Sequence, residues 1–335
     1  MHLSRYLLRK SLPISSQFQT AQQVVAQRLF SGQAVSPKLV KQLRELTGSP
    51  LKDCMKTLDE TKGDIEQAKE LLRKRGLADA DKKVGRATAE GYVGMRLDRQ
   101  SRLLTMVELH CETDFVAKTE KFKEGLDRVI ETLHKQGNAL QFGQTDMSNQ
   151  DRINQIAREL KLSKPLDSDL QSQTLEDGIK YIISKTQENC KLAKIYQRTW
   201  NPEEGQIMHS YIHNPQQINS MLFGKLGTAI LMQTNDKKHN GEIQDLAESL
   251  ALHIAAMKPT YLNKKEVPED LKKKLKEEGP KDQALWKMYN RDVLMEQELA
   301  TTEESIKVKT LMRQRESEIF TPILIKEWAF FNIGA

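Results

Sequence analysis

A strand-like segment that runs directly into a helix is the feature that most constrains the fold. Residues 103–110 are rich in Leu, Val, Thr and Met and contain neither Gly nor Pro, which is typical of an extended segment. Thr113 and Asp114 follow, and both residue types accept hydrogen bonds from the free backbone N–H groups at the start of a helix. Apolar residues recur at helical spacing from Phe122 onward. The sequence therefore predicts a rigid corner that holds the carboxylate of Asp114 beside the aromatic ring of Phe115.

The same corner carries a resemblance to a known family. The pentapeptide Glu112-Thr113-Asp114-Phe115-Val116 resembles the signature of elongation factor Ts, the guanine-nucleotide exchange factor of elongation factor Tu. Similar motifs occur in order over most of residues 36–259, at Leu46-Thr47-Gly48, Gly63-Asp64-Ile65-Glu66-Gln67-Ala68, Gly85-Arg86, Ala89-Glu90-Gly91, Glu188-Asn189, Tyr211-Ile212-His213, Gly224-Lys225-Leu226-Gly227 and His253-Ile254-Ala255-Ala256-Met257-Lys258-Pro259. Ordered motifs over that length make the resemblance specific.

The resemblance implies roles for the residues at the corner. Asp114 and Phe115 would enter the GTPase domain of elongation factor Tu beside its magnesium site. Phe115 would separate side chains and helices of that domain, while Asp114 would help to displace the network that holds the ion. Thr113, Val116 and Lys118 would position and flank this pair.

Further contacts with the same partner are implied in two other parts of the chain. The residues concerned are Leu46, Thr47, Gly48, Tyr211, His213, His253 and Met257. Spacing by itself also allows simpler interpretations. Phe115 and Phe122 are seven residues apart and would share one buried helix face as ordinary core. A lone histidine on an apolar helix, such as His253, is as readily a structural residue.

Helix start and stop signals in the sequence predict the domain organisation. Ser36-Pro37, Ser49-Pro50 and Asp64 each indicate a helix start, and Gly48 and Gly63 indicate helix ends. We expect an α+β fold, in which a three-helix ubiquitin-associated-like module precedes a duplicated α+β core of two related subdomains. The predicted ranges are 1–33 for a transit peptide, 34–76 for the module, 77–84 for a linker, 85–137 for the first subdomain, 138–174 for a polar insertion, 175–262 for the second subdomain with a leading helix, 263–300 for a charged helical segment and 301–335 for a C-terminal segment with a final strand.

The first residues predict an organellar address. Residues 1–33 carry four basic residues and no acidic one, and the first acidic residue of the chain is Glu45. Such a composition is typical of a mitochondrial transit peptide, and Arg28-Leu29-Phe30-Ser31 resembles a matrix processing site. A disordered tail is the simpler alternative. The net charge of +6 falls to +2 without this segment, so the charge gives little reason to expect a nucleic-acid partner.

The sequence contains no recognisable catalytic or phosphate-binding motif. It has no phosphate-binding loop, nucleophile elbow or zinc-protease motif, and no apolar run of the roughly 20 residues that cross a bilayer. His209 and His213 are four apart, but their surroundings predict a strand, so a shared metal is not expected. Three widely spaced cysteines indicate reduced thiols, with Cys54 on an apolar helix face.

These observations favour one function and leave two alternatives. We expect a non-enzymatic exchange factor of the mitochondrial matrix, without cofactor or metal, that binds mitochondrial elongation factor Tu in its GDP-bound and nucleotide-free states. A ubiquitin-binding adaptor is suggested by the first module alone. A structural subunit of another mitochondrial assembly is suggested by the polar insertion at 138–174 and by the last strand, where Phe330 and Asn332 replace the Arg and Glu usual in the family.

Overall fold

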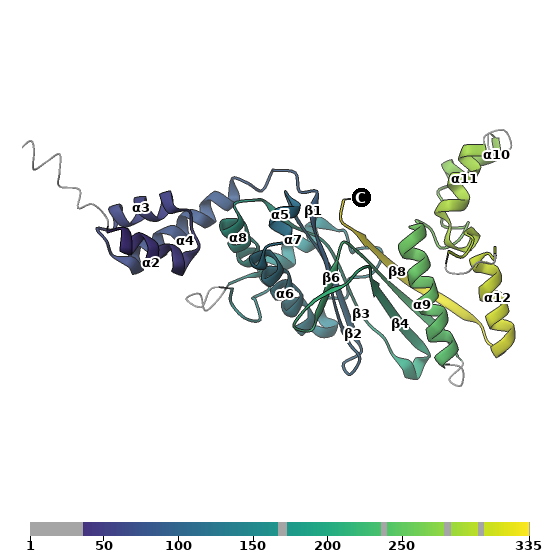
Figure 1. Cartoon of the computed structure of the whole chain (residues 1–335). Helices are drawn as coiled ribbons and strands as arrows, with labels where there is room; N and C mark the ends of the chain where they lie inside the picture. Colours follow the sequence, from purple (N-terminus) through teal and green to yellow (C-terminus); the bar gives the residue numbers. More distant parts are fainter. Residues whose placement is uncertain (1–35, 167–172, 236–239, 278–282, 301–304, 335) are drawn as a thin grey trace, which may run out of the picture. The chain divides into compact units, whose positions relative to one another are not determined.

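The computed structural model shows a mixed α+β protein (Figure 1). The structure describes residues 36–166, 173–235, 240–277, 283–300 and 305–334. Two compact units divide the chain, Met1–Arg75 and Gly76–Ala335. The predicted transit peptide, at 1–33, lies outside the described residues.

The described part of the first unit consists of helices that begin where the sequence predicts. α2 spans Pro37–Thr47, α3 spans Leu51–Glu60, and α4 spans Ile65–Asp81 and continues into the second unit. Gly48 ends α2 in the left-handed conformation, with φ of 64°. The apolar core of its described residues consists of Val40, Leu43, Cys54, Leu58, Ala68 and Leu72. The prediction of a buried Cys54 thiol is confirmed.

The linker predicted at 77–84 is wrong in its first half, because α4 runs on to Asp81. Ala78 and Ala80 are strong helix formers, and Ala80 is fully buried in a core cluster of the second unit. Asp81 also pairs with Lys180, at 2.9 Å between Oδ1 and Nζ. Tertiary contacts therefore extend the helix beyond its expected end.

The second unit contains two antiparallel sheets. The larger sheet has the strand order β3-β2-β1-β6-β5, and the smaller has the order β4-β7-β8. The strands are β1 Glu90–Asp98, β2 Leu103–Cys111, β3 Cys190–Thr199, β4 Gln206–Ile212, β5 Gln216–Ile218, β6 Met221–Gly224, β7 Leu226–Thr234 and β8 Ile323–Asn332. The strands expected at 103–110 and in the C-terminal segment are confirmed.

The strands do not divide between the sheets at the predicted subdomain boundaries. β3, β5 and β6 fall within residues 175–262, yet all three join the sheet of β1 and β2. β3 pairs with β2 over its full length, from Cys111↔Cys190 to Leu103↔Thr199. One part of the chain thus supplies strands to both sheets, because β2 is apolar enough to be buried along nearly its whole length and needs partners on both edges.

Apolar clusters show how the layers pack. Residues of β1, β2 and β3 pack against residues of β4, β7 and β8, so the two sheets face each other. The opposite face of the larger sheet packs against α5 Asp114–Ala117, α6 Glu120–Lys135, α7 Gln150–Glu159 and α8 Leu175–Thr186. The opposite face of the smaller sheet packs against α9 Asn240–Met257 and α12 Val308–Ile319. Figure 1 shows α6 and α8 beside the larger sheet and α9 beside β4.

The segments outside the two sheets contain further helices. Within the predicted polar insertion, α7 buries Ile153 and Ala157. A capping box between Thr174 and Asp177 starts α8 at the predicted residue, Leu175. The charged segment contains α10 Glu269–Glu277, α11 Gln283–Asp292 and a short turn at Leu294–Glu296. None of the helices in the described ranges is long and apolar enough to span a membrane.

Candidate functional site

The predicted strand-to-helix corner is present in the structure. β2 ends at Cys111, and α5 begins at Asp114. Thr113 precedes the helix in an extended conformation, with φ of −128° and ψ of 156°. Its Oγ1 accepts a hydrogen bond from the Val116 N–H at 3.3 Å, which satisfies one of the free donors of the helix start. The corner is therefore a capped and well-defined feature.

The two phenylalanines of this region have opposite environments. Phe115 is 79% exposed, whereas Phe122 is fully buried in the core cluster beneath α6. Val116 and Ala117, the next two residues of α5, are buried in the same cluster. The alternative in which Phe115 shares a buried face with Phe122 is therefore wrong. The phenyl ring of Phe115 faces solvent, while Val116 and Ala117 anchor α5 in the core.

A salt bridge fixes the charge beside this ring. Lys118 Nζ lies 2.7 Å from Asp114 Oδ2, one helical turn away. This hydrogen bond lowers the pKa of Asp114, and the same interaction raises the pKa of Lys118. Asp114 is thus a carboxylate at neutral pH. The corner presents a negative charge and a large apolar surface on consecutive residues.

Hydrogen bonds to residues distant in sequence hold the corner in place. The carboxylate of Glu188 accepts hydrogen bonds from Thr113 N–H at 2.9 Å and from Thr113 Oγ1–H at 2.7 Å. Glu112 Oε1 accepts from the Asn189 N–H at 2.6 Å. The sequence marks Glu188-Asn189 only as part of the family resemblance, and no local pattern connects it with residues 75 positions earlier.

Val116, expected to flank the pair, is 9% exposed and belongs to the core, so its side chain is unavailable to a partner. Its apolar side chain packs into the core cluster together with Ala117 and Phe122, which explains this burial. Lys118 is exposed, as a partner-contacting residue requires.

In the first unit, the three expected contact residues divide in the same way. Leu46 is 56% exposed, and Gly48 is exposed in the turn after α2. Thr47 is buried, and its hydroxyl donates to the Leu43 carbonyl at 2.7 Å. Thr47 therefore has a structural role, while Leu46 and Gly48 are accessible.

The expected contact residues Tyr211 and His213 lie at the end of β4. Tyr211 Oη and His213 Nδ1 are 2.8 Å apart, and His213 is exposed. The predicted strand over His209 is confirmed. Four residues along a strand span about 13 Å, so His209 and His213 are too far apart to share a metal. The described residues contain no group of three or more potential ligands.

His253 does not face a partner, contrary to the expectation. Its side chain is fully buried in α9. Nδ1 accepts from the Ala300 N–H at 3.1 Å, and Nε2 lies 2.8 Å from Gln297 Oε1, so both ring nitrogens have internal partners. Burial lowers the pKa of this histidine. His253 joins α9 to the segment after α11, and Met257 at the end of α9 is half-buried.

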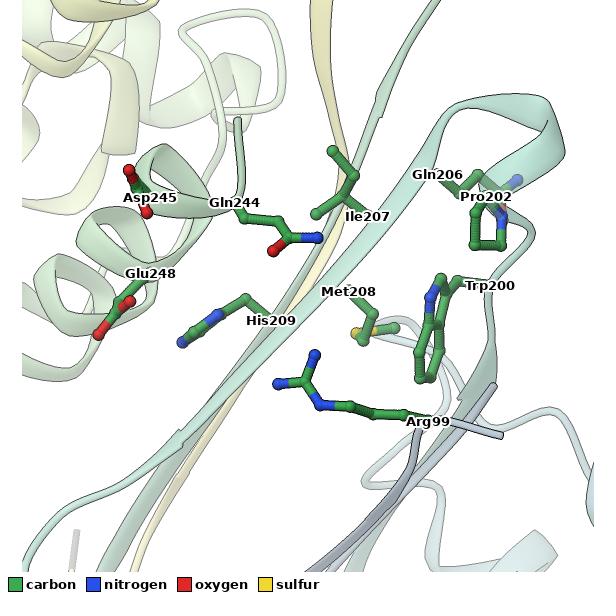
Figure 2. Close-up of a pocket in the computed structure, with 10 residues that line it drawn as sticks. All are labelled: Arg99, Trp200, Pro202, Gln206, Ile207, Met208, His209, Gln244, Asp245 and Glu248. Atoms are coloured by element: carbon green, nitrogen blue, oxygen red, sulfur yellow. The ribbon is translucent and has the colours of Figure 1, made fainter. Parts of the chain in front are cut away.

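A polar hollow of about 190 Å³ lies apart from the corner, between α9, β4 and the turn after β1 (Figure 2). Its lining residues are Arg99, Trp200, Pro202, Gln206, Ile207, Met208, His209, Gln244, Asp245 and Glu248. Figure 2 shows His209 extending from β4 toward α9, and Arg99 directed toward His209. Burial lowers the pKa of His209. None of the residues expected to contact elongation factor Tu lines this hollow.

Together, the fold and the corner define an α+β protein that displays a rigid apolar and acidic contact element. Comparison with known proteins gives the family. The profile described as "Elongation factor TS" matches residues 112–335, beginning at the corner. Elongation factor Ts of Aquifex aeolicus is 32% identical over 318 residues, which are 90% of this chain and 98% of the relative. Those of Nautilia profundicola and Clostridium novyi are 35% and 28% identical, over 72% and 90% of this chain and 69% and 93% of the relatives. The chain belongs to the elongation factor Ts family.

Proposed function

We propose that this protein is the guanine-nucleotide exchange factor of mitochondrial elongation factor Tu. It binds the GDP-bound partner, promotes release of GDP and leaves a nucleotide-free complex that GTP reloads during translation elongation. The single observation that carries the proposal is the exposure of Phe115, at 79%, on a capped corner next to an ionised Asp114. Membership of the elongation factor Ts family supplies the class of partner.

The mechanism requires differential binding and no covalent chemistry, so the protein is not an enzyme in this proposal. A factor that binds the empty partner more tightly than the loaded one lowers nucleotide affinity by the same factor. Phe115 exposes roughly 160 Å² of surface, taking about 200 Å² for a phenylalanine. Burial of that ring in a pocket that only the empty state offers contributes about 2–3 kcal/mol. Each ~1.4 kcal/mol is tenfold, so the ring alone supplies roughly thirtyfold to a hundredfold.

Asp114 acts on the metal side of the partner's nucleotide site. The diphosphate of GDP depends on Mg²⁺ to offset its negative charge. A carboxylate brought next to that ion competes for its ligands and repels the phosphates. Lys118 holds the Asp114 side chain through a hydrogen bond of 2.7 Å. Thr113 holds both residues through the helix cap.

Contacts away from the corner anchor the complex. In this proposal Leu46 and Gly48, in a ubiquitin-associated-like module, touch the GTPase domain, while Tyr211 and His213, in the second half of a duplicated core, touch another domain of elongation factor Tu. Binding energy from such remote surfaces offsets the strain imposed near the nucleotide. The basic composition of residues 1–33 supports import into the mitochondrial matrix.

The test is the release of fluorescent GDP from mitochondrial elongation factor Tu, with and without this protein. We expect the wild type to accelerate GDP release, and we expect Phe115→Ala to reduce this acceleration by roughly thirtyfold to a hundredfold, in line with about 2–3 kcal/mol of lost differential binding. Phe320→Ala is the matched control, because Phe320 is 93% exposed at the end of α12 and has no role in the proposal. Equal rates for wild type and Phe115→Ala would remove the ring from the mechanism. Failure of the wild type to accelerate release, together with co-migration in a large assembly, would favour a structural subunit.

A further inference from the structure

The backbone pairing between β2 and β3 ends at the corner, and side-chain hydrogen bonds connect the two segments beyond it. Its last backbone pair is Cys111↔Cys190, where β2 ends and β3 begins. The next two positions on each side are Glu112 and Thr113 opposite Asn189 and Glu188. Here each acidic side chain accepts from the backbone N–H of the opposite strand, at 2.6 Å for Asn189 to Glu112 and 2.9 Å for Thr113 to Glu188. Beyond the last backbone pair, side-chain carboxylates thus replace backbone carbonyls as the acceptors of the N–H groups of the opposite segment.

Glu188 also decides where the proton of the Thr113 hydroxyl points. An ionised carboxylate only accepts hydrogen bonds, so at 2.7 Å the Thr113 Oγ1–H donates to Glu188 Oε1. The lone pairs of Oγ1 then remain free to accept from Val116 N–H at 3.3 Å. The chain of donors runs from Val116 to Thr113 to Glu188. The cap of α5 is therefore directed by a residue at the end of α8.

A short helix needs such an external support. α5 has only four residues and cannot be stable by its own hydrogen bonds. Asn189 strengthens the support, because it is buried and its Nδ2 donates to the carbonyls of Val84 and Arg86, at 3.1 and 2.8 Å. The corner, the start of β3 and the segment before β1 are fixed to one another by these bonds.

We propose that Glu188 is a positioning residue for nucleotide exchange. By accepting two hydrogen bonds from Thr113, it fixes the direction in which Asp114 and Phe115 leave the corner, and it does so without contacting the partner. This inference rests on the proposed exchange function. Displacement of an interacting group by about 1 Å costs on the order of a hundredfold in rate, so orientation at this point is as important as the ring itself.

The test compares Glu188→Gln with wild type in GDP release measured over a range of factor concentrations. The amide keeps the size of the side chain but faces one of the two Thr113 donors with its own N–H₂ group. We expect the limiting rate to fall by about tenfold to a hundredfold, while the concentration at half-saturation stays within about twofold because the remote contacts remain. Glu159→Gln is the control, since Glu159 is exposed on α7 and bonds only Gln155 among the described residues.

A combined variant separates positioning from general stability. If Glu188 acts only by orienting Asp114 and Phe115, adding Glu188→Gln to the double variant Asp114→Ala/Phe115→Ala leaves the rate of GDP release unchanged. Effects that multiply would overturn the inference. The inference would also be overturned if Glu188→Gln kept the wild-type limiting rate while Phe115→Ala was impaired. That result would not contradict the proposed exchange function. A wild type without exchange activity would overturn both.

Variants of Thr113 give an independent check if Glu188→Gln folds poorly. Thr113→Ser keeps the hydroxyl and should keep the wild-type limiting rate. Thr113→Val keeps the shape but removes the hydroxyl, so it should lower the limiting rate as Glu188→Gln does. Equal rates for the serine and valine variants would contradict the role of the hydroxyl and overturn the inference.

Discussion

The two phenylalanines of the corner region provide a direct comparison of surface and core. They are seven residues apart and chemically identical, but Phe115 is 79% exposed and Phe122 is fully buried. Replacement of each by alanine therefore separates the contribution of packing from the contribution of a displayed ring.

The expected stability losses follow from the buried areas. Phe122 removes roughly 200 Å² from water, which at 25 cal/mol per Å² is about 5 kcal/mol and agrees with the 3–5 kcal/mol typical of Phe→Ala in a core. Phe115 covers only about one fifth of its surface, or roughly 40 Å², so its loss costs about 1 kcal/mol at most. In a domain of this size, 1 kcal/mol shifts the melting temperature by about 2–4 °C. We expect a shift of roughly 10–20 °C for Phe122→Ala and no more than about 4 °C for Phe115→Ala.

Thermal melting by circular dichroism measures both variants, and GDP release is measured on the same preparations below the transition. Phe115→Ala should be well folded and defective in exchange. Phe122→Ala should be less stable and, at temperatures where it is folded, retain most of its exchange activity. The reasoning would be refuted by a melting temperature of Phe115→Ala as low as that of Phe122→Ala, because the exposed ring would then belong to the core.

Two further predictions concern groups buried in the described core. Burial lowers the pKa of His134 from 6.5 to about 4, so the folded protein binds this proton more weakly than the unfolded chain, and stability falls as the pH drops from about 6.5 toward 4. The free energy of unfolding in urea should therefore be lower at pH 5 than at pH 7, and His134→Gln should reduce this difference by about 2 kcal/mol. A difference that His134→Gln leaves unchanged would refute the lowered pKa of His134. Burial also raises the pKa of Cys111 to about 12 and raises those of Cys54 and Cys190, and all three thiols are free and buried. Iodoacetamide at pH 8 should leave them unmodified in the folded protein and label all three in urea; rapid labelling of Cys111 in the native state would contradict its burial.

Features that depend on neighbouring residues could be predicted from the sequence. The strand at Leu103–Cys111, the cap at Thr113 and the start of α8 after Thr174 appear where their residue types indicate. These features follow from backbone geometry and from hydrogen bonds between residues three or four positions apart. The family resemblance, carried by ordered motifs, was likewise available without coordinates, and the comparisons confirm it.

Features that depend on distant residues could not be predicted in the same way. The direction of Phe115, the burial of His253 against Gln297 and Ala300, and the sharing of β3 with the sheet of β2 all depend on contacts across many residues. Helical spacing places Phe115 and Phe122 on one face only if a single helix contains both. The break between α5 and α6, at the cap formed by Thr119, removes that condition.

The sequence by itself determined that a strand meets a helix at residues 111–114 and that a carboxylate and a phenyl ring stand there. Only the tertiary structure decided that the ring faces solvent and that Glu188, 75 positions along the chain, holds the cap. The physical reason is that a helix start is encoded by adjacent side chains. The exposure of a side chain and the support of a four-residue helix depend instead on which distant segments pack behind it.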